Sequence, residues 1–241
     1  MKMVSFGADI SCNDISCSDT LISNVTSDVN LLSKEVIYAG VTNITGDDLV
    51  ISAVINDNQL EDVNSKIIKI LKDNAENFGD LNGIGLSPEN AGEGVSYAEI
   101  ELNEDYYPDA IVIGFDTYAG ESFVGDVASS AMKAALGMDF VGEISGGCVE
   151  NILEIPGVGF VSKDTDDPVV IVSIENIEHV GIVAGAMIGS ILGNKNTYFV
   201  KRGTPTNVIP GSVIFSVSAF LNGNIIDLAE PFNQRMNILP K

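Results

Sequence analysis

The sequence is poor in the residues that most often carry recognisable chemistry. Its 241 residues include no tryptophan, one histidine and three cysteines. Three cysteines cannot build a disulfide framework, and they suit a reducing compartment. Cys12 and Cys17 lie at a C-x4-C spacing, but the chain lacks the second close pair of Cys or His that a structural zinc site requires. We therefore expect a cytoplasmic protein without structural zinc.

Positive charge is also scarce. Twelve Lys and Arg stand against 34 Asp and Glu, a formal net charge of −22. A nucleic-acid-binding protein needs a basic patch, and none is visible, so we expect no nucleic-acid partner. Residues 1–109 carry 20 of the acids and 5 of the bases. This acidity favours solubility or a salty cytoplasm, with a specific cationic partner as the alternative.

Long apolar runs and phosphate-binding glycine motifs are missing too. The first 11 residues contain no apolar run of signal-peptide length, and the longest apolar stretch, Val180 to Leu192, has 13 residues. A bilayer span needs about 20, so no membrane partner is expected. The glycine-rich loop around Gly83-x-Gly85 has Pro88 where a third glycine would stand, and no G-K-[ST] occurs. The common ATP and NAD folds are therefore disfavoured.

What the chain does have is a globular composition. Apolar residues make up 45% of it, and the mean hydropathy is +0.25. These values exclude global disorder, and the length suits one large domain or two small ones. The charge balance changes near residues 104–108, which predicts an acidic N-terminal subdomain over 1–104 and a C-terminal subdomain over 105–241.

Hydrophobic periodicity predicts an α+β fold with mixed or mainly antiparallel sheets and about three helices packed on them. Two strand-helix-strand runs in the C-terminal half match in spacing, which indicates a duplicated β-α-β unit. We expect helices at 60–78, 122–136 and 180–192, and strands at 35–44, 49–56, 97–102, 110–115, 139–144, 148–154, 158–161, 169–174, 198–201, 213–221 and 225–228. Asn222-Gly223 is the strongest hairpin signal.

The last predicted helix carries glycine every fourth residue, at Gly181, Gly185, Gly189 and Gly193. On a helix this spacing forms one ridge without side chains, and each interior glycine costs about 0.8–1 kcal/mol relative to alanine. Close packing must offset that cost. Two interpretations remain open, a buried helix lying tightly on a sheet and a helix–helix contact across a subunit interface.

The best candidate site is the loop from an apolar strand into a helix at residues 114–122. It offers two acids and three hydroxyl groups, on Asp116, Thr117, Tyr118, Glu121 and Ser122. Ligands favour the carboxyl ends of strands in sheets of this kind, and two carboxylates can hold a divalent cation or orient an amine. The alternative is that Ser122 only caps the helix and Glu121 favours its start electrostatically.

Two more acids follow apolar strands, Asp9 after VSFGA and Glu175 after VVIVSI. If these strand ends meet, Asp9, Glu175 and Asp116, with Glu121, form an oxygen-ligand set for a divalent cation such as Mg²⁺. Beyond such a cation, the sequence leaves the cofactor unknown.

A second candidate is the turn Gly146-Gly147-Cys148, where two glycines would expose a thiol. A nucleophilic cysteine needs a base, and His179 is the only histidine. The alternative is that Cys148 is a small buried hydrophobe.

The adjacent bases Lys201 and Arg202 form a third candidate, because they could bind a carboxylate or phosphate of a substrate. The alternative is an ion pair with surface acids.

The sequence thus predicts a cytoplasmic small-molecule enzyme or binding protein, with acid–base or metal-assisted chemistry at residues 114–122. The alternative function is a self-assembling structural or regulatory homo-oligomer built on the glycine-ridged helix. Both interpretations include a homo-oligomer, and the first adds a small-molecule ligand.

Overall fold

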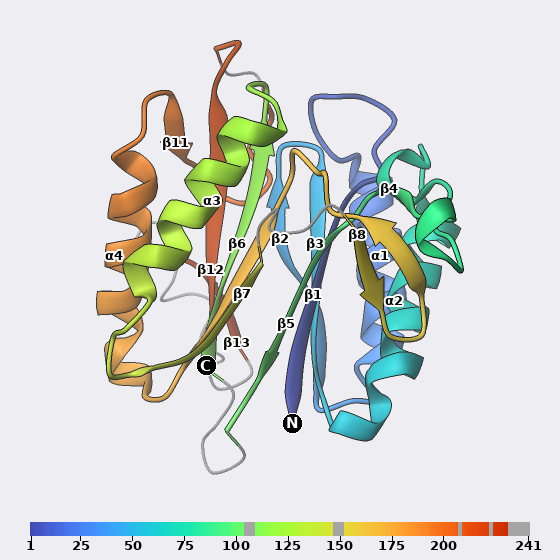
Figure 1. Cartoon of the computed structure of the whole chain (residues 1–241), viewed down its shortest axis with the longest axis horizontal. Coiled ribbons are helices and arrows are strands. Elements are labelled where there is room, and N and C mark those ends of the chain that lie inside the picture. The colour runs from blue at the N-terminus through green and yellow to red at the C-terminus, as the bar shows by residue number, and fades with distance from the viewer. Residues whose placement is uncertain (104–108, 147–151, 207–208, 222–223, 231–241) are drawn as a thin grey trace.

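Each half of the chain forms a mainly antiparallel sheet with two helices on its outer face, and the two sheets pack against each other (Figure 1). The computed structural model describes residues 1–103, 109–146, 152–206, 209–221 and 224–230. The layers run helices, sheet, sheet, helices. This arrangement confirms the predicted α+β class with mainly antiparallel sheets.

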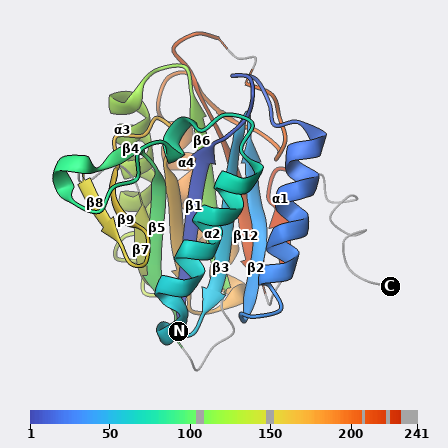
Figure 2. The ribbon, with the colours of Figure 1, turned by 90° about the vertical axis from the view of Figure 1, so that its right-hand side faces the viewer.

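The first sheet has the strand order β2-β3-β1-β5. Its helices α1 and α2 lie side by side on the outer face (Figure 2). The order along the chain is β-α-β-β-α-β, with β3 antiparallel to β1 and β2, and β5 antiparallel to β1. The elements are β1 (Lys2–Asp9), α1 (Asp19–Leu32), β2 (Tyr38–Thr45), β3 (Asp48–Ile55), α2 (Leu60–Asn74) and β5 (Ser96–Glu101).

The second sheet has the order β11-β12-β6-β10-β7, with α3 and α4 on its outer face. Its strands β12, β6, β10 and β7 repeat the order β5-β1-β3-β2 of the first sheet, a ferredoxin-like arrangement, and β11 adds an edge strand parallel to β12. The duplicated β-α-β pattern seen in the sequence corresponds to β6-α3-β7 and β10-α4-β11. The elements are β6 (Asp109–Thr117), α3 (Glu121–Ala135), β7 (Val141–Gly146), β10 (Val169–Ile174), α4 (Val180–Leu192), β11 (Thr197–Phe199), β12 (Val213–Leu221) and β13 (Asn224–Asp227).

A small third sheet links the two halves. Its strands are β4 (Gly92–Gly94), β9 (Gly159–Ser162) and β8 (Ile152–Ile155), and β4 of the first half pairs in parallel with β9 of the second. Short 3-10 turns at Asp57–Gln59, Gly79–Leu81, Pro88–Asn90 and Ile177–His179 complete the described elements.

Three apolar cores hold the layers together. One lies between the first sheet and its helices, one between the second sheet and its helices, and one between the sheets. Central strands such as β3 and β10 are buried along their whole length because both of their faces are covered. This explains why they appear in the sequence as continuous apolar runs rather than alternating ones.

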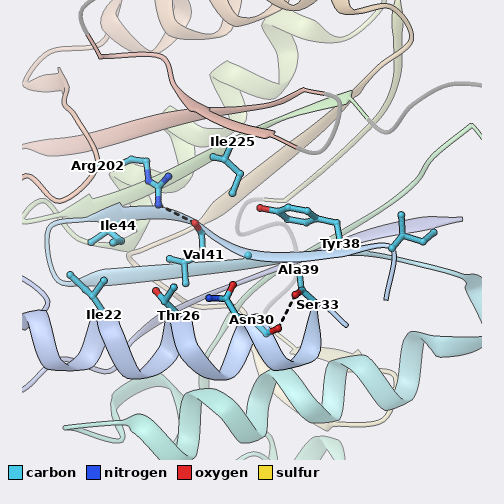
Figure 3. Close-up of a pocket in the computed structure, with 12 residues that line it drawn as sticks. Ile22, Thr26, Asn30, Ser33, Tyr38, Ala39, Val41, Ile44, Arg202 and Ile225 are labelled. Atoms are coloured by element: carbon cyan, nitrogen blue, oxygen red, sulfur yellow. Dashed lines mark hydrogen bonds between the residues drawn. The ribbon is translucent and has the colours of Figure 1, made fainter. Parts of the chain in front are cut away.

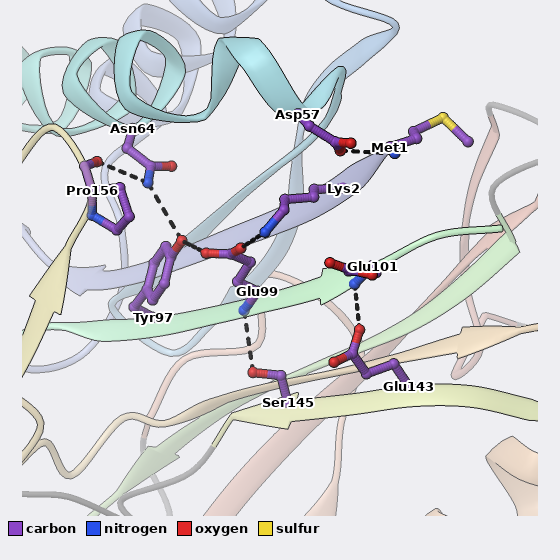
Figure 4. Close-up of polar contacts among 10 residues, drawn as sticks. All are labelled: Met1, Lys2, Asp57, Asn64, Tyr97, Glu99, Glu101, Glu143, Ser145 and Pro156. Carbon is purple, nitrogen blue, oxygen red and sulfur yellow. Dashed lines mark hydrogen bonds and ion pairs between the residues drawn. The ribbon is translucent and has the colours of Figure 1, made fainter. Parts of the chain in front are cut away.

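The edge strands β5 and β7 also meet, through side chains (Figure 4). The backbone N–H of Glu99 donates to Ser145 Oγ at 3.2 Å, and that of Glu101 donates to the Glu143 carboxylate. On the other face the Glu99 carboxylate lies 2.5 Å from Lys2 Nζ and accepts the Tyr97 hydroxyl at 2.7 Å. Polar groups that an open edge would expose are thus satisfied across the seam between the two sheets.

One helix was not predicted. Helix α1 begins after Ser18, whose side chain accepts the N–H of Leu21, and buries Leu21, Val25, Val29 and Leu32. Its remaining residues are mainly Asp, Asn, Ser and Thr, which favour helices weakly, so only the apolar spacing and the cap signal it. The described residues therefore hold four α-helices rather than about three, and α2 ends at Asn74 rather than at residue 78.

Helix α4 has the predicted bounds, but the interpretation of its glycine ridge as a close contact with a sheet is wrong. The side chains that α4 buries are Val180, Val183, Ala184, Met187 and Ile191. A Cβ built at Gly181, Gly185 or Gly189 meets no atom of the described chain within 4 Å. The ridge therefore faces outward.

Two predicted features fall outside the described residues, the boundary at 104–108 and the Asn222-Gly223 turn. Strands β12 and β13, which precede and follow residues 222–223, pair antiparallel. The division into subdomains at 104/105 stays a prediction. None of the described helices has both the length and the apolarity of a membrane span.

Candidate functional site

Three aspartates meet where the β2-β3 hairpin approaches the end of β6. Asp47 lies in the hairpin turn, Asp48 opens β3, and Asp116 is the next-to-last residue of β6. All three are buried, and one carboxylate oxygen from each lies within 4.8 Å of the other two. The cluster thus joins the first half of the chain to the second.

A glycine lets these strands come together. Gly46 has a φ of +60°, and a Cβ there would collide with the side chains of Asp116 and Thr206. The Thr206 hydroxyl contacts the Asp116 carboxylate and lies 3.2 Å from Asp47 Oδ1. The hairpin turn therefore places two carboxyl groups directly on the end of β6.

The triad forms part of a larger acidic pocket of about 410 Å³. Its lining contains eight aspartates and no basic side chain. The antiparallel pair Asp9–Asp48 of β1 and β3 brings in Asp9, and the pairing of Val169 with Gly114 brings in the residues just before β10. The lining residues are Asp9, Asp14, Asp47, Asp48, Asp80, Asp116, Asp166, Asp167, Thr117, Tyr118 and Gly120.

Burial raises the pKa of several of these carboxyl groups towards or beyond neutral pH. Burial and the neighbouring carboxylates raise the pKa of Asp9 to about 6. Burial likewise raises the pKa values of Asp80 and Asp116 to about 7, and those of Asp48 and Asp167 well above their ordinary value. Without a bound cation, some of the carboxyl groups in the pocket therefore carry a proton, and a cation that binds there would displace it.

Asp48 carries the clearest sign of a ligand. It is 4% exposed, and its Oδ1 has no hydrogen-bond partner among the described residues, while its carboxyl group is hydrogen-bonded to that of Asp167. An unpaired buried carboxylate oxygen is costly unless an ion or a donor occupies the adjacent space.

The donor set suits a hard divalent cation. Ca²⁺ binds oxygens at about 2.4 Å, so two ligands on opposite sides of it lie about 4.8 Å apart, and Mg²⁺ requires slightly less. The triad oxygens already lie within that span. An all-oxygen set favours Mg²⁺, Ca²⁺ or Mn²⁺ over softer metals.

Four sequence-predicted residues line this pocket: Asp9, Asp116, Thr117 and Tyr118. Thr117 Oγ1 donates to the Ser212 carbonyl at 3.2 Å, and the Tyr118 hydroxyl donates to the Asp14 carbonyl at 2.9 Å. These bonds fix the strand end and the 10–18 loop at the rim of the pocket.

Glu121 and Ser122 lie elsewhere. They are exposed at the start of α3 and line a separate hollow of about 350 Å³ with Asp126 and Asp164. Helix α3 begins at Glu121 after Gly120, so the interpretation of Ser122 as the helix cap is wrong.

Glu175 is also apart from Asp116 and Asp9. Strand β10 runs antiparallel to β6, so Ile174 pairs with Asp109, whereas Val169 pairs with Gly114. Glu175 therefore follows β10 at the opposite end of the sheet from the acidic pocket, and the predicted convergence with Asp9 and Asp116 does not occur.

The predicted Cys148–His179 pair cannot be placed, because Gly147 and Cys148 lie outside the described residues. Gly146 ends β7 opposite Val170, at a φ of +129°. The His179 ring stacks on Phe140 at 4.2 Å, just before the Val141 end of β7. Gly146 and His179 thus lie at opposite ends of β7.

The two predicted basic residues take different roles. Lys201 Nζ lies 3.1 Å from Glu230 Oε1, as in the ion-pair alternative. Arg202 turns inward and donates from Nη2 to the Val41 carbonyl at 3.0 Å. It lines a second pocket.

The sequence interpretation missed Asp14, Asp47, Asp48, Asp80, Asp166, Asp167 and Thr206. Asp47-Asp48 resembled an ordinary turn, and Asp166-Asp167 an ordinary loop. The available signal was the position of both acidic pairs at or near the start of a strand that is buried throughout.

Comparison with known proteins gives a family without an assigned activity. The family model described as "Uncharacterised conserved protein UCP005278" matches residues 2–236. An uncharacterised protein of Methanothermobacter thermautotrophicus is 55% identical over 240 residues, covering 99% of this chain and 98% of that protein. An uncharacterised protein of Methanocaldococcus jannaschii is 40% identical over 227 residues, covering 94% of each.

Solved structures resemble the chain only distantly. An anthrone oxidase-like protein shares 7% identity at a TM-score of 0.32, covering 95% of this chain and 94% of that one. A putative chlorite dismutase shares 10% identity at a TM-score of 0.29, covering 94% and 95%. Scores this low have no bearing on chemistry.

Proposed function

The chain belongs to the family of Uncharacterised conserved protein UCP005278, and we propose that it is a cytoplasmic small-molecule-binding protein or enzyme whose acidic pocket works with a divalent cation. Asp47, Asp48 and Asp116 hold the cation. The observation that carries this proposal is the triad of buried carboxylates with an unpaired oxygen on Asp48.

The cation determines which substrates the pocket accepts. Eight carboxyl groups with no base among the lining residues repel an anion, so a phosphate or carboxylate enters only by binding the metal. A volume of about 410 Å³ leaves room beyond the cation for a small molecule.

Any acid–base step falls to a carboxyl group outside the triad. Asp80 lines the same pocket, and its pKa of about 7 lies near the working pH of a general base or acid. Its Oδ2 accepts the Asp9 N–H at 3.4 Å, which fixes its position. Metal-assisted proton transfer or hydrolysis is the reaction class that this arrangement favours.

Titration calorimetry of EDTA-treated protein with MgCl₂, MnCl₂ and CaCl₂ at pH 7.5 tests the proposal. We expect saturable binding of at least one cation and a loss of at least tenfold in affinity for Asp116→Asn, because one ligand of the triad is then neutral. Asp126→Asn is the matched control, since Asp126 is exposed on α3 outside the pocket. Absence of binding at millimolar cation, or equal binding by Asp116→Asn, would contradict the proposal.

A second candidate function is homo-oligomerisation through α4. The glycine ridge faces open space, Val180–Leu192 contains no charged residue, and Ile182 and Leu192 are about half exposed. In a chain of net charge −22, an uncharged apolar face is where a second copy meets the least repulsion. Glycines allow the two helix backbones to approach closely.

The effect of Gly185→Glu on the mass of the particle in solution tests whether α4 forms an interface between copies. A side chain at Gly185 fits the isolated protomer, so we expect light scattering to show a monomer with an undiminished melting temperature, where the wild type forms a dimer or larger assembly. Asn24→Glu on the exposed side of α1 makes the same charge change and should leave the assembly intact. A monomeric wild type would rule out the α4 interface.

A further inference from the structure

A second cavity, of about 530 Å³, lies along β2 on the side away from β3. Strand β2 is the edge of the first sheet, and the cavity occupies the space between α1 and the end of the second sheet. Figure 3 shows Arg202 and Ile225 approaching β2 from one side, and Ile22, Thr26 and Asn30 of α1 from the other. This cavity shares no lining residue with the acidic pocket.

Among the described residues that line the cavity, Arg202 is the one with a charged side chain. A guanidinium group offers five N–H donors, and one of those of Arg202 reaches the Val41 carbonyl. Its Nε is buried with no partner among the described residues. Among the described residues, the Val41 carbonyl is thus the one hydrogen-bond partner of the Arg202 guanidinium.

The nearest acid does not neutralise Arg202 by a direct ion pair. Asp227 Oδ2 accepts the backbone N–H of Arg202 at 3.0 Å, and Asp227 Oδ1 accepts that of Ala229 at 2.9 Å. Both carboxylate oxygens are therefore engaged by backbone amides. Burial lowers the pKa of Arg202 although Asp227 raises it, so the environment favours an added negative charge.

The rest of the lining combines aliphatic side chains with hydroxyl and amide groups. Ile22, Ile37, Ile44 and Ile225 supply apolar surface, and Tyr38 packs edge-on against Phe220 at 4.3 Å. One cationic group beside aliphatic side chains, in a cavity of this size, is the pattern of a site for an amphipathic small molecule.

We propose that this cavity binds a small amphipathic anion, a carboxylate or phosphate monoester on an unbranched apolar chain, with its headgroup on Arg202. The guanidinium accepts the headgroup through charge-assisted hydrogen bonds. The isoleucines bury the chain. Cation binding plays no part in this recognition, so the site is independent of the function proposed for the acidic pocket.

Titration calorimetry with octanoate, hexanoate, octyl phosphate and the neutral octanol tests the proposal. We expect octanoate to bind about fifteenfold more tightly than hexanoate, because each buried methylene contributes about fourfold. Octanol should bind at least tenfold more weakly than octanoate. A preference for octyl phosphate over octanoate would identify the headgroup as phosphate.

Variants assign the binding to the cavity. Arg202→Gln should lower the affinity for octanoate at least tenfold. Lys201→Gln, which removes the neighbouring charge outside the lining, should change that affinity less than twofold. If Arg202→Gln does not fold, Thr26→Phe, which fills the cavity, decides the matter in the same way. Asp116→Asn should bind octanoate normally, whatever happens to cation binding. Failure of both anions to bind the wild type, or unchanged binding by Arg202→Gln or Thr26→Phe, would overturn the proposal.

Discussion

The metal-free protein is expected to lose stability as the pH rises from 5 to 8, and a divalent cation is expected to restore it at pH 8. The carboxyl groups of the acidic pocket have raised pKa values in the folded state. Between pH 4 and 7 the folded chain therefore binds more protons than the unfolded chain. The free energy of unfolding decreases with rising pH over any range in which the folded state binds more protons than the unfolded state.

Asp80 sets the scale of this effect. Its pKa is about 7 in the folded protein against an ordinary value of 3.8. A shift of this size alone removes about 3 kcal/mol of stability between pH 5 and 8. Asp9 and Asp116 act in the same direction. A cation at a thousand times its dissociation constant returns about 4 kcal/mol.

Urea unfolding at pH 5, 6, 7 and 8, with EDTA and then with MgCl₂ or CaCl₂, measures both parts. Repeating the series at high NaCl separates the pocket from general surface repulsion, because screening weakens the latter far more. A metal-free protein that is as stable at pH 8 as at pH 5 would contradict the titration of the pocket.

Most of the fold could be predicted from the sequence, because an element that is buried on both faces is a continuous run of apolar residues. β10 and α4 have the bounds that their apolar runs predicted. Helix α1 escaped because its apolar face consists of four residues among polar ones. The outward direction of the glycine ridge was not predicted either. The spacing of the glycines shows that one face of the helix has no side chains, but it does not show what lies opposite that face.

The candidate site was predictable only in part, for a topological reason. Asp9 and Asp116 each follow an apolar strand, and that local signal was sufficient to select them. The meeting of Asp116 with Asp47 and Asp48 depends on how two separate sheets pack, and that of Asp9 with Asp48 depends on the pairing of β1 with β3. No local pattern encodes either of these. Glu175 gave the same local signal, but the antiparallel register of β10 with β6 carries it to the other end.

Asp48→Asn is expected to stabilise the metal-free protein at pH 8 while abolishing its response to cations. Asp48 is buried, and its Oδ1 has no partner among the described residues. Such a group costs about 2 kcal/mol, and the neutral amide avoids its ionisation. For a chain of this length that corresponds to a rise of about 4–8 °C in the melting temperature. At pH 5 the change should be smaller, because burial raises the pKa of Asp48 and lower pH favours its neutral form.

This pH signature distinguishes a ligand-binding carboxylate from a structural one. If Asp48 serves the stability of the fold, the substitution should lower the melting temperature at both pH values. If Asp48 serves to bind a cation, the substitution should raise the melting temperature at pH 8 when the cation is absent. Calorimetric melting of wild type, Asp48→Asn and the exposed control Asp126→Asn, at both pH values with EDTA and with MgCl₂, makes the comparison. A lower melting temperature for Asp48→Asn at pH 8 in EDTA, or an undiminished rise on adding cation, would show that Asp48 supports the fold and not a metal site.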